Sequence, residues 1–83
     1  MISKEKAEVI FKKVIDTWIE RHGKEKLDPQ IIGAIRLTIF ALPDDDGKKR
    51  ITMMETGKTH LVPVEDIILN GLNGKDVEKY PEE

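Results

Sequence analysis

The chain has 83 residues and no cysteine, and its 14 basic and 16 acidic residues give a formal net charge of -2. This length suits a single small domain over residues 1–83, with a tail from about 74 to 83 that can fray. The lack of cysteine excludes disulfides, thiolate metal sites and thiol catalysis. No apolar run reaches the ~20 residues of a membrane helix, and residues 1–6 lack the layout of a signal peptide. We therefore expect a cytoplasmic protein with no membrane partner.

The balanced charge also argues against a nucleic-acid partner. Proteins that bind DNA or RNA usually carry a basic patch. The only basic run here, Lys48 to Arg50, directly follows three aspartates that cancel much of its field. We therefore expect no nucleic acid among the partners.

Residues 4–22 show the clearest periodicity in the chain. Their apolar side chains recur at steps of three and four residues, which places them on one stripe of a helix. Ser3 is suited to cap the first turn, and Gly23 can end the helix in a left-handed conformation. We predict an amphipathic N-terminal helix over residues 4–22. The stripe consists of Ala7, Ile10, Phe11, Val14, Ile15, Trp18 and Ile19.

Three later segments are predicted to be strands. Asp28 and Pro29 resemble a helix N-cap and a first-turn proline, but we expect any helix there to be short. From 35 to 41 the apolar residues alternate, which is typical of a strand with one buried face. The segments 51–55 and 59–64 are the second and third strands, separated by a glycine-containing turn.

The turn at 43–47 joins the first two strands and sets their register. A five-residue loop pairs Ile39 with Ile51 and Leu37 with Met53, so that all four share the core face. The predicted fold is α+β, with the N-terminal helix packed on a three-stranded antiparallel meander and a short C-terminal helix near 65–69. We expect one core cluster that contains Phe11, Val14, Ile15, Trp18, Leu37, Ile39 and Ile51.

The sequence offers no catalytic arrangement. Nucleophilic catalysis needs a nucleophile beside a base, but the only serine, Ser3, is expected to act as a helix cap. His22 fits the end of the first helix, and His60 is expected to face Glu55 across two strands. The segment 56–59 imitates the end of a P-loop but lacks its first glycine. We predict a protein that is not an enzyme.

The acidic turn formed by Asp44, Asp45 and Asp46 is the most chemically distinctive feature. Adjacent carboxylates repel one another unless a cation offsets them, and calcium prefers such oxygen ligands. We expect a weak calcium site with these three residues as ligands, and calcium is the only cofactor predicted. The alternative is a solvated turn without an ion. Further ligands would have to come from elsewhere, with Glu65, Asp66 and Asp76 as candidates.

A second hypothesis is a protein-interaction module that uses a sheet edge or an exposed sheet face. In the predicted register, Phe40 and Met54 lie diagonally next to each other on the face away from the helix. Large exposed apolar residues can mark a surface for a protein partner. The alternative is that residues 67–72 fold over this face and bury both side chains.

By its length, its order of helix then meander, and its acidic turn at Asp44 to Asp46, the chain resembles small uncharacterised α+β proteins of methanogenic archaea. This resemblance implies an intracellular archaeal protein without an assigned activity, for which calcium association through acidic patches is plausible. The stretch 61–67 also looks like the end of a strand in small PRC-barrel domains, although the long N-terminal helix departs from that pattern.

Overall fold

A computed structural model of the chain describes residues 1–83 and contains four α-helices, one 3₁₀ helix and a two-stranded antiparallel sheet. The fold is therefore α+β, but the predicted three-stranded meander is wrong because one of its strands is a helix. The elements are α1 (Lys4–His22), η1 (Lys24–Lys26), α2 (Pro29–Phe40), β1 (Lys48–Thr52), β2 (Thr59–Pro63), α3 (Val64–Asn70) and α4 (Gly74–Val77).

Helix α1 has the bounds and the caps that its sequence predicts. The Ser3 hydroxyl accepts a hydrogen bond from the Lys6 N–H at 3.3 Å, which satisfies one of the free donors of the first turn. Gly23 ends the helix with a φ of 87°, and its N–H donates to the Ile19 carbonyl. A side chain at this left-handed position would be strained, so glycine suits it.

Helix α2 begins as its sequence predicts but is not short. The Asp28 carboxylate accepts from the Ile31 N–H at 2.9 Å, and Pro29 occupies the first turn, where its missing N–H costs nothing. The helix then continues for 12 residues. Its cap signals were correct, and only the expected length was wrong.

The segment 35–41, predicted as a strand, therefore lies almost entirely within α2. Its isoleucines and threonine favour strands by propensity, but packing against α1 overrides that preference. Ile39 is fully buried, whereas Leu37 is 75% exposed, so the two side chains do not share a face. The predicted pairings of Ile39 with Ile51 and of Leu37 with Met53 are therefore wrong.

The two remaining strands form the predicted hairpin. Strand β1 spans Lys48–Thr52, so it begins and ends three residues before the predicted strand 51–55, and it pairs antiparallel with β2, with Ile51 opposite His60. The turn between them closes with a hydrogen bond from the Met53 N–H to the Lys58 carbonyl at 2.8 Å. Gly57 has a φ of 69° in this turn. The P-loop-like segment 56–59 is thus a hairpin turn and the start of β2.

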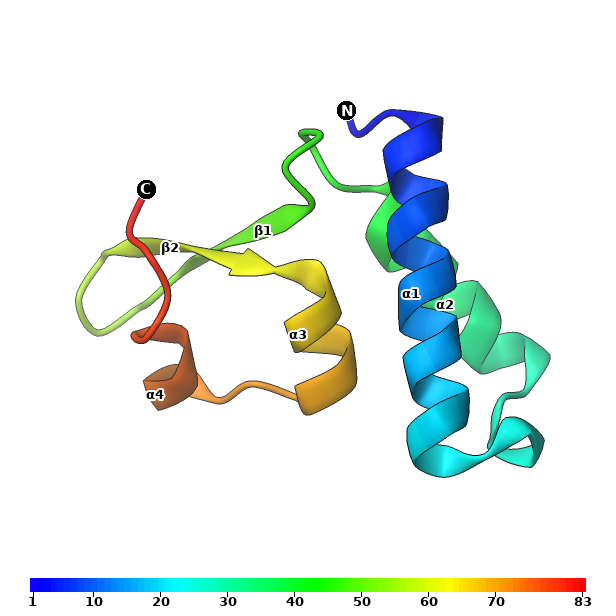
Figure 1. Cartoon of the computed structure of the whole chain (residues 1–83). Coiled ribbons are helices and arrows are strands. Elements are labelled where there is room, and N and C mark those ends of the chain that lie inside the picture. The colour runs from blue at the N-terminus through cyan, green and yellow to red at the C-terminus, as the bar shows by residue number, and fades with distance from the viewer.

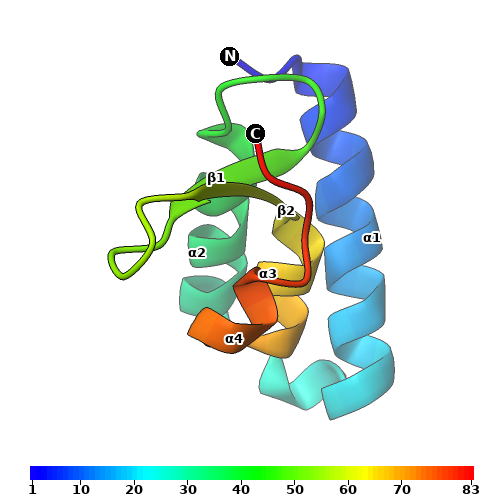
Figure 2. The ribbon, with the colours of Figure 1, turned by 90° about the vertical axis from the view of Figure 1, so that its left-hand side faces the viewer.

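The molecule has two halves, and Figure 1 shows α3 at the boundary between them. The helical half consists of α1, α2 and α3, with α1 in contact with both other helices. The hairpin half consists of β1, β2, α4 and residues 78–83. Figure 2 shows the C-terminal segment rising from α4 toward the sheet. None of the helices has both the length and the apolar character needed to span a bilayer.

The main core lies among the three helices rather than between α1 and the sheet. Val14 and Ile39 belong to it as predicted, and Phe11, Ile15 and Trp18 pack against it. Leu37 and Ile51 are not part of it, because the first faces solvent and the second belongs to the hairpin half. The buried cluster is Ile2, Ala7, Val14, Ile35, Ile39, Leu42 and Val64.

Candidate functional site

The acidic turn lies in the loop between α2 and β1, next to the start of α1. The Ser3 N–H donates to an Asp45 carboxylate oxygen, so this aspartate sits beside the positive end of the α1 dipole. The Asp46 carboxylate accepts from the Lys48 N–H at 3.0 Å. Two of the three predicted ligands are therefore already hydrogen-bonded to the backbone.

Gly47 closes the turn in a conformation that requires glycine. Its φ is 67°, and a Cβ at this position would lie 2.8 Å from the Ile10 Cδ1 atom. The Gly47 carbonyl accepts from the Val64 N–H at 3.0 Å. The turn is thus tied to α1 on one side and to the start of α3 on the other.

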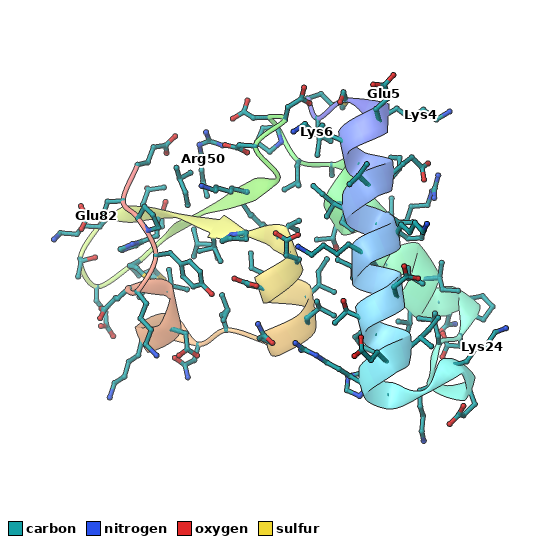
Figure 3. All side chains as sticks on the ribbon, in the orientation of Figure 1. Lys4, Glu5, Lys6, Lys24, Arg50 and Glu82 are labelled. Carbon is teal, nitrogen blue, oxygen red and sulfur yellow. The ribbon has the colours of Figure 1, made fainter.

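Arg50 supplies a cation to the acidic turn. Its Nη2 atom lies 2.8 Å from an Asp44 oxygen and 3.9 Å from an Asp46 oxygen, and its Nε–H donates to the Glu83 carboxylate. The hydrogen bond to Glu83 raises the pKa of Arg50, and Asp44 adds to this effect. Figure 3 shows Arg50 on the hairpin half. Its ion pairs with Asp44 and Glu83 connect the acidic turn to the C-terminal segment.

The structure places no group of three or more His, Asp or Glu side chains so that they could hold a metal ion. Asp44, Asp45 and Asp46 lie close in sequence, but their carboxylates are already paired with Arg50 or accept hydrogen bonds from two backbone N–H groups. The calcium site stays a prediction, and in this structure a calcium ion would compete with Arg50. The other candidate ligands have local partners: Glu65 with Lys13, Asp66 with the Tyr80 hydroxyl, and Asp76 with the Asn73 N–H.

One edge of the sheet is covered by the chain itself. The Leu61 N–H donates to the Pro81 carbonyl at 2.8 Å, and the Glu83 N–H donates to the Thr59 carbonyl at 2.9 Å. Residues 81–83 therefore lie along the outer edge of β2 like a short third strand. Two backbone groups of this edge, the Leu61 N–H and the Thr59 carbonyl, therefore have partners within the molecule.

The other edge, along β1, is open. Thr59 and Leu61 direct their backbone groups toward the tail, so in an antiparallel ladder Lys49 and Ile51 pair with β2, whereas Arg50 and Thr52 direct theirs outward. No backbone hydrogen bond satisfies the outward N–H and C=O groups of Arg50 and Thr52. Sequence reasoning missed this edge because it placed β1 between two strands.

His60 and Tyr80 connect the C-terminal residues 78–83 to the rest of the molecule. The His60 Nδ1 atom lies 2.9 Å from the Tyr80 carbonyl, which can only accept, so Nδ1 carries the proton. The Tyr80 hydroxyl donates to Asp66 at 3.1 Å. Burial raises the pKa of the Tyr80 phenol, and the bond to Asp66 adds to the shift. His60 faces Ile51, so its predicted pairing with Glu55 is wrong.

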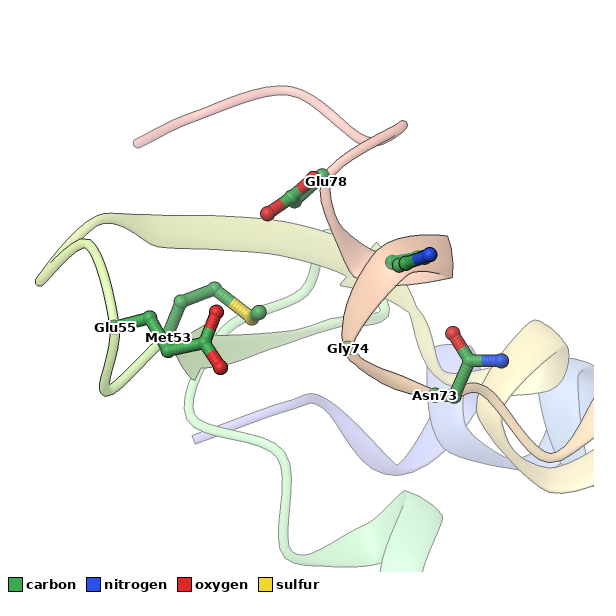
Figure 4. A pocket seen from close by; sticks show the side chains of 6 residues that line it. Met53, Glu55, Asn73, Gly74 and Glu78 are labelled. Carbon is green, nitrogen blue, oxygen red and sulfur yellow. The ribbon is translucent and has the colours of Figure 1, made fainter.

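Two open pockets lie between the hairpin turn and α4. The larger, about 380 Å³, has one apolar residue, Met53, in its lining, and Figure 4 shows Glu78 across the opening from Met53 and Glu55. The smaller, about 240 Å³, has only polar or charged residues in its lining, including His60. Small-molecule sites are usually lined mainly by apolar side chains. Neither pocket has the character of such a site.

The apolar patch predicted from Phe40 and Met54 does not exist. Met54 is 98% exposed in the hairpin turn. Phe40 belongs to α2, is partly buried, and lies 4.5 Å from the Arg36 guanidinium that covers its ring. The prediction failed because it rested on a strand at residues 35–41.

Comparison of the chain with protein-family models, curated protein sequences and solved structures found no match. The resemblance to archaeal α+β domains therefore stays a prediction.

Proposed function

We propose that this domain is a protein-interaction module that binds an extended segment of a partner protein along the outer edge of β1. The proposal rests on one observation, which is that the two edges of the sheet differ in their backbone hydrogen bonding. The edge of β2 is closed by residues 81–83, whereas the outward backbone groups of Arg50 and Thr52 have no partner. An added strand would supply their hydrogen bonds, which is how many sheet edges bind peptides.

The side chains along β1 favour an acidic segment. Lys49 is exposed and Lys48 is partly exposed. The charge of Arg50 is already balanced by Asp44 and Glu83, so the two lysines supply the free positive charge of the strand. Edge lysines also discourage pairing between copies of the same strand, since like charges would meet. An acidic partner strand would turn this repulsion into attraction.

The direct test is a titration of isotopically labelled protein with a short capped peptide of alternating valine and glutamate. The amide chemical shifts of the protein are measured at each peptide concentration. We expect the largest shifts at Arg50 and Thr52, and weaker binding of the matched peptide of valine and lysine. The Thr52→Pro variant removes one outward N–H and no hydrogen bond between β1 and β2. Proline is tolerated at such positions on a sheet edge. Loss of one hydrogen bond should weaken binding roughly fivefold.

The matched control is Thr52→Val. Both variants lose the hydrogen bond between the Thr52 and Thr59 hydroxyls at 2.9 Å, but only the proline variant loses the backbone donor. Equal affinities of the two variants for the acidic peptide would contradict the proposal. Shifts confined to α1 and α2 would contradict it as well.

A further inference from the structure

The tail strand, residues 81–83, covers the outer edge of β2 with only half of the hydrogen bonds that a strand makes at such an edge. Thr59 and Leu61 each direct an N–H and a C=O group toward it. The Leu61 N–H donates to the Pro81 carbonyl, and the Thr59 carbonyl accepts from the Glu83 N–H. The Thr59 N–H and the Leu61 carbonyl have no hydrogen-bond partner. The tail strand is therefore an incomplete strand.

Pro81 is the reason for one of the two missing bonds. Glu82 forms an antiparallel bridge with His60, so Pro81 lies opposite Leu61 in this ladder. A residue in this position normally donates its N–H to the opposite carbonyl, but proline has no N–H. A strand with any other residue at this position can complete the pair with Leu61.

The other attachments of the tail strand are polar and exposed. Pro81, Glu82 and Glu83 are all exposed, so burial of apolar side chains does not hold them in place. A Glu82 carboxylate oxygen lies 3.3 Å from the Lys58 Nζ atom, and Glu83 pairs with Arg50. Exposed ion pairs contribute little to stability. The tail strand is thus weakly held.

The tail strand also leaves space beside β2. The smaller pocket, about 240 Å³, is lined by Thr56, Lys58, His60, Glu78 and Glu82. Its lining includes the central residue of the tail strand, and all of its lining side chains are polar or charged. A strand with a longer polar side chain in place of Glu82 has room to extend into this pocket.

We propose that the outer edge of β2 is a second strand-binding site, that residues 81–83 are its weak internal ligand, and that an extended acidic segment of another protein displaces them. The chemistry of this partner follows from that of the tail strand. Displacement removes the ion pair of Lys58 and leaves Arg50 with the acidic turn alone, so carboxylates of the partner restore both pairings. A partner residue other than proline opposite Leu61 adds the hydrogen bond that the tail strand lacks. The site lies on the opposite edge from the proposed site on β1, and neither depends on the other.

The test compares the parent protein with a variant whose tail strand is released. Glu82→Lys/Glu83→Lys reverses the charges that face Lys58 and Arg50. The helical half has its own core, so circular dichroism should show it folded in this variant. The released variant no longer has an internal competitor, and its affinity for a strand at this edge should be at least about tenfold higher than that of the parent.

The probe is the capped peptide Lys-Tyr-Val-Glu-Glu, which repeats residues 79–83 with valine in place of proline. Isotopically labelled protein is titrated with it, and the largest amide shifts should lie at Thr59 and Leu61. The matched peptide Lys-Tyr-Pro-Glu-Glu lacks the N–H opposite Leu61. It should bind the parent and the released variant roughly fivefold more weakly than the valine peptide does.

Two variants control for charge and for the other edge. Asp16→Lys/Glu20→Lys makes the same change in net charge at exposed positions of α1, and it should bind the valine peptide as the parent does. Thr52→Pro removes an outward N–H of β1 and leaves the edge of β2 intact, so it should not weaken binding to β2.

Four results would overturn the inference: equal affinities of the parent and the released variant for the valine peptide, an equal gain in Asp16→Lys/Glu20→Lys, equal affinities of the valine and proline peptides, or binding that is lost in Thr52→Pro. The last result would place the peptide on β1 and support the proposed function instead. Binding that is kept in Thr52→Pro, with shifts at Thr59 and Leu61, would support the site on β2 whether or not β1 binds a strand.

Discussion

The helical half and the hairpin half are held together by different interactions. The helical half has a cluster of seven buried apolar residues shared by α1, α2, α3 and the segments that flank them. The hairpin half has few fully buried side chains, and its tail is attached through Arg50, His60 and Tyr80. Apolar packing contributes most of the stability of a domain, whereas exposed ion pairs contribute little. The two halves should therefore respond differently to cavities, to loss of charge and to pH.

The largest effect should come from a cavity in the helical half. Ile39→Ala removes a fully buried side chain and should lower the free energy of unfolding by about 2–5 kcal/mol. Leu37→Ala, two residues away on the same helix, should change it by less than about 0.5 kcal/mol, because this side chain is exposed. Denaturant unfolding followed by circular dichroism measures both, on dilute protein. Similarly large losses in the two variants would instead mean that both side chains are buried on one face, as the alternating pattern of a strand requires.

The comparison of Ile39 with Leu37 also shows where sequence reasoning reached its limit. Apolar residues at 31, 35, 39 and 42 fit a helical period, and those at 35, 37, 39 and 41 fit a strand. The N-cap at Asp28 favours the helix, whereas the alternation of apolar residues from 35 to 41 favours the strand. The caps of α1, the hairpin turn and the glycine that ends α3 were predictable because each depends on a few neighbouring residues.

The candidate site could be predicted only in part. The acidic turn is visible in the sequence, and so is the basic run that directly follows it, from which Arg50 pairs with Asp44 and Asp46. The bond between Arg50 and Glu83 joins residues 33 positions apart, and no local pattern encodes such a contact. The open edge of β1 depends on which strands exist, so the error at residues 35–41 concealed it.

An intermediate effect, confined to the hairpin half, is expected when Arg50 is replaced. Arg50→Met keeps much of the side-chain volume but loses the ion pairs to Asp44 and Glu83. Amide hydrogen exchange should become faster in β2 and the tail, while the protection of α1 and α2 stays unchanged. Arg36→Met is the matched control, because it breaks an ion pair within the helical half. Uniformly faster exchange in Arg50→Met would show that the two halves unfold as one unit.

A smaller effect should appear at alkaline pH. The pKa of Tyr80 is raised in the folded protein, first by burial and then by the bond to Asp66, so folding favours the protonated phenol. Its contribution is complete below the ordinary tyrosine pKa of about 10 and is lost as the pH rises through the folded value. The thermal midpoint of the parent should therefore fall more steeply above about pH 10 than that of Tyr80→Phe.

The difference between the parent and Tyr80→Phe isolates the contribution of the phenol, because the two proteins share all other titratable groups. Tyr80 is the only tyrosine, so ultraviolet absorbance of the phenolate reports its ionisation directly. A titration midpoint at or below that of free tyrosine would contradict the raised pKa.

The smallest effect concerns calcium at the acidic turn. If Asp44 and Asp46 bind calcium, the ion must displace Arg50, whose Nη2 atom lies 2.8 Å from Asp44. Arg50→Met should therefore gain more thermal stability from millimolar calcium than the parent does, at matched ionic strength. A ligand at ten times its Kd adds about 1.4 kcal/mol, which is the upper range expected for the variant. Asp44→Asn/Asp46→Asn in the Arg50→Met background should lose this gain, because the ligands themselves are removed. A parent protein that responds more strongly than Arg50→Met would mean that calcium binds elsewhere, and an equal response in the triple variant would exclude the turn as the site.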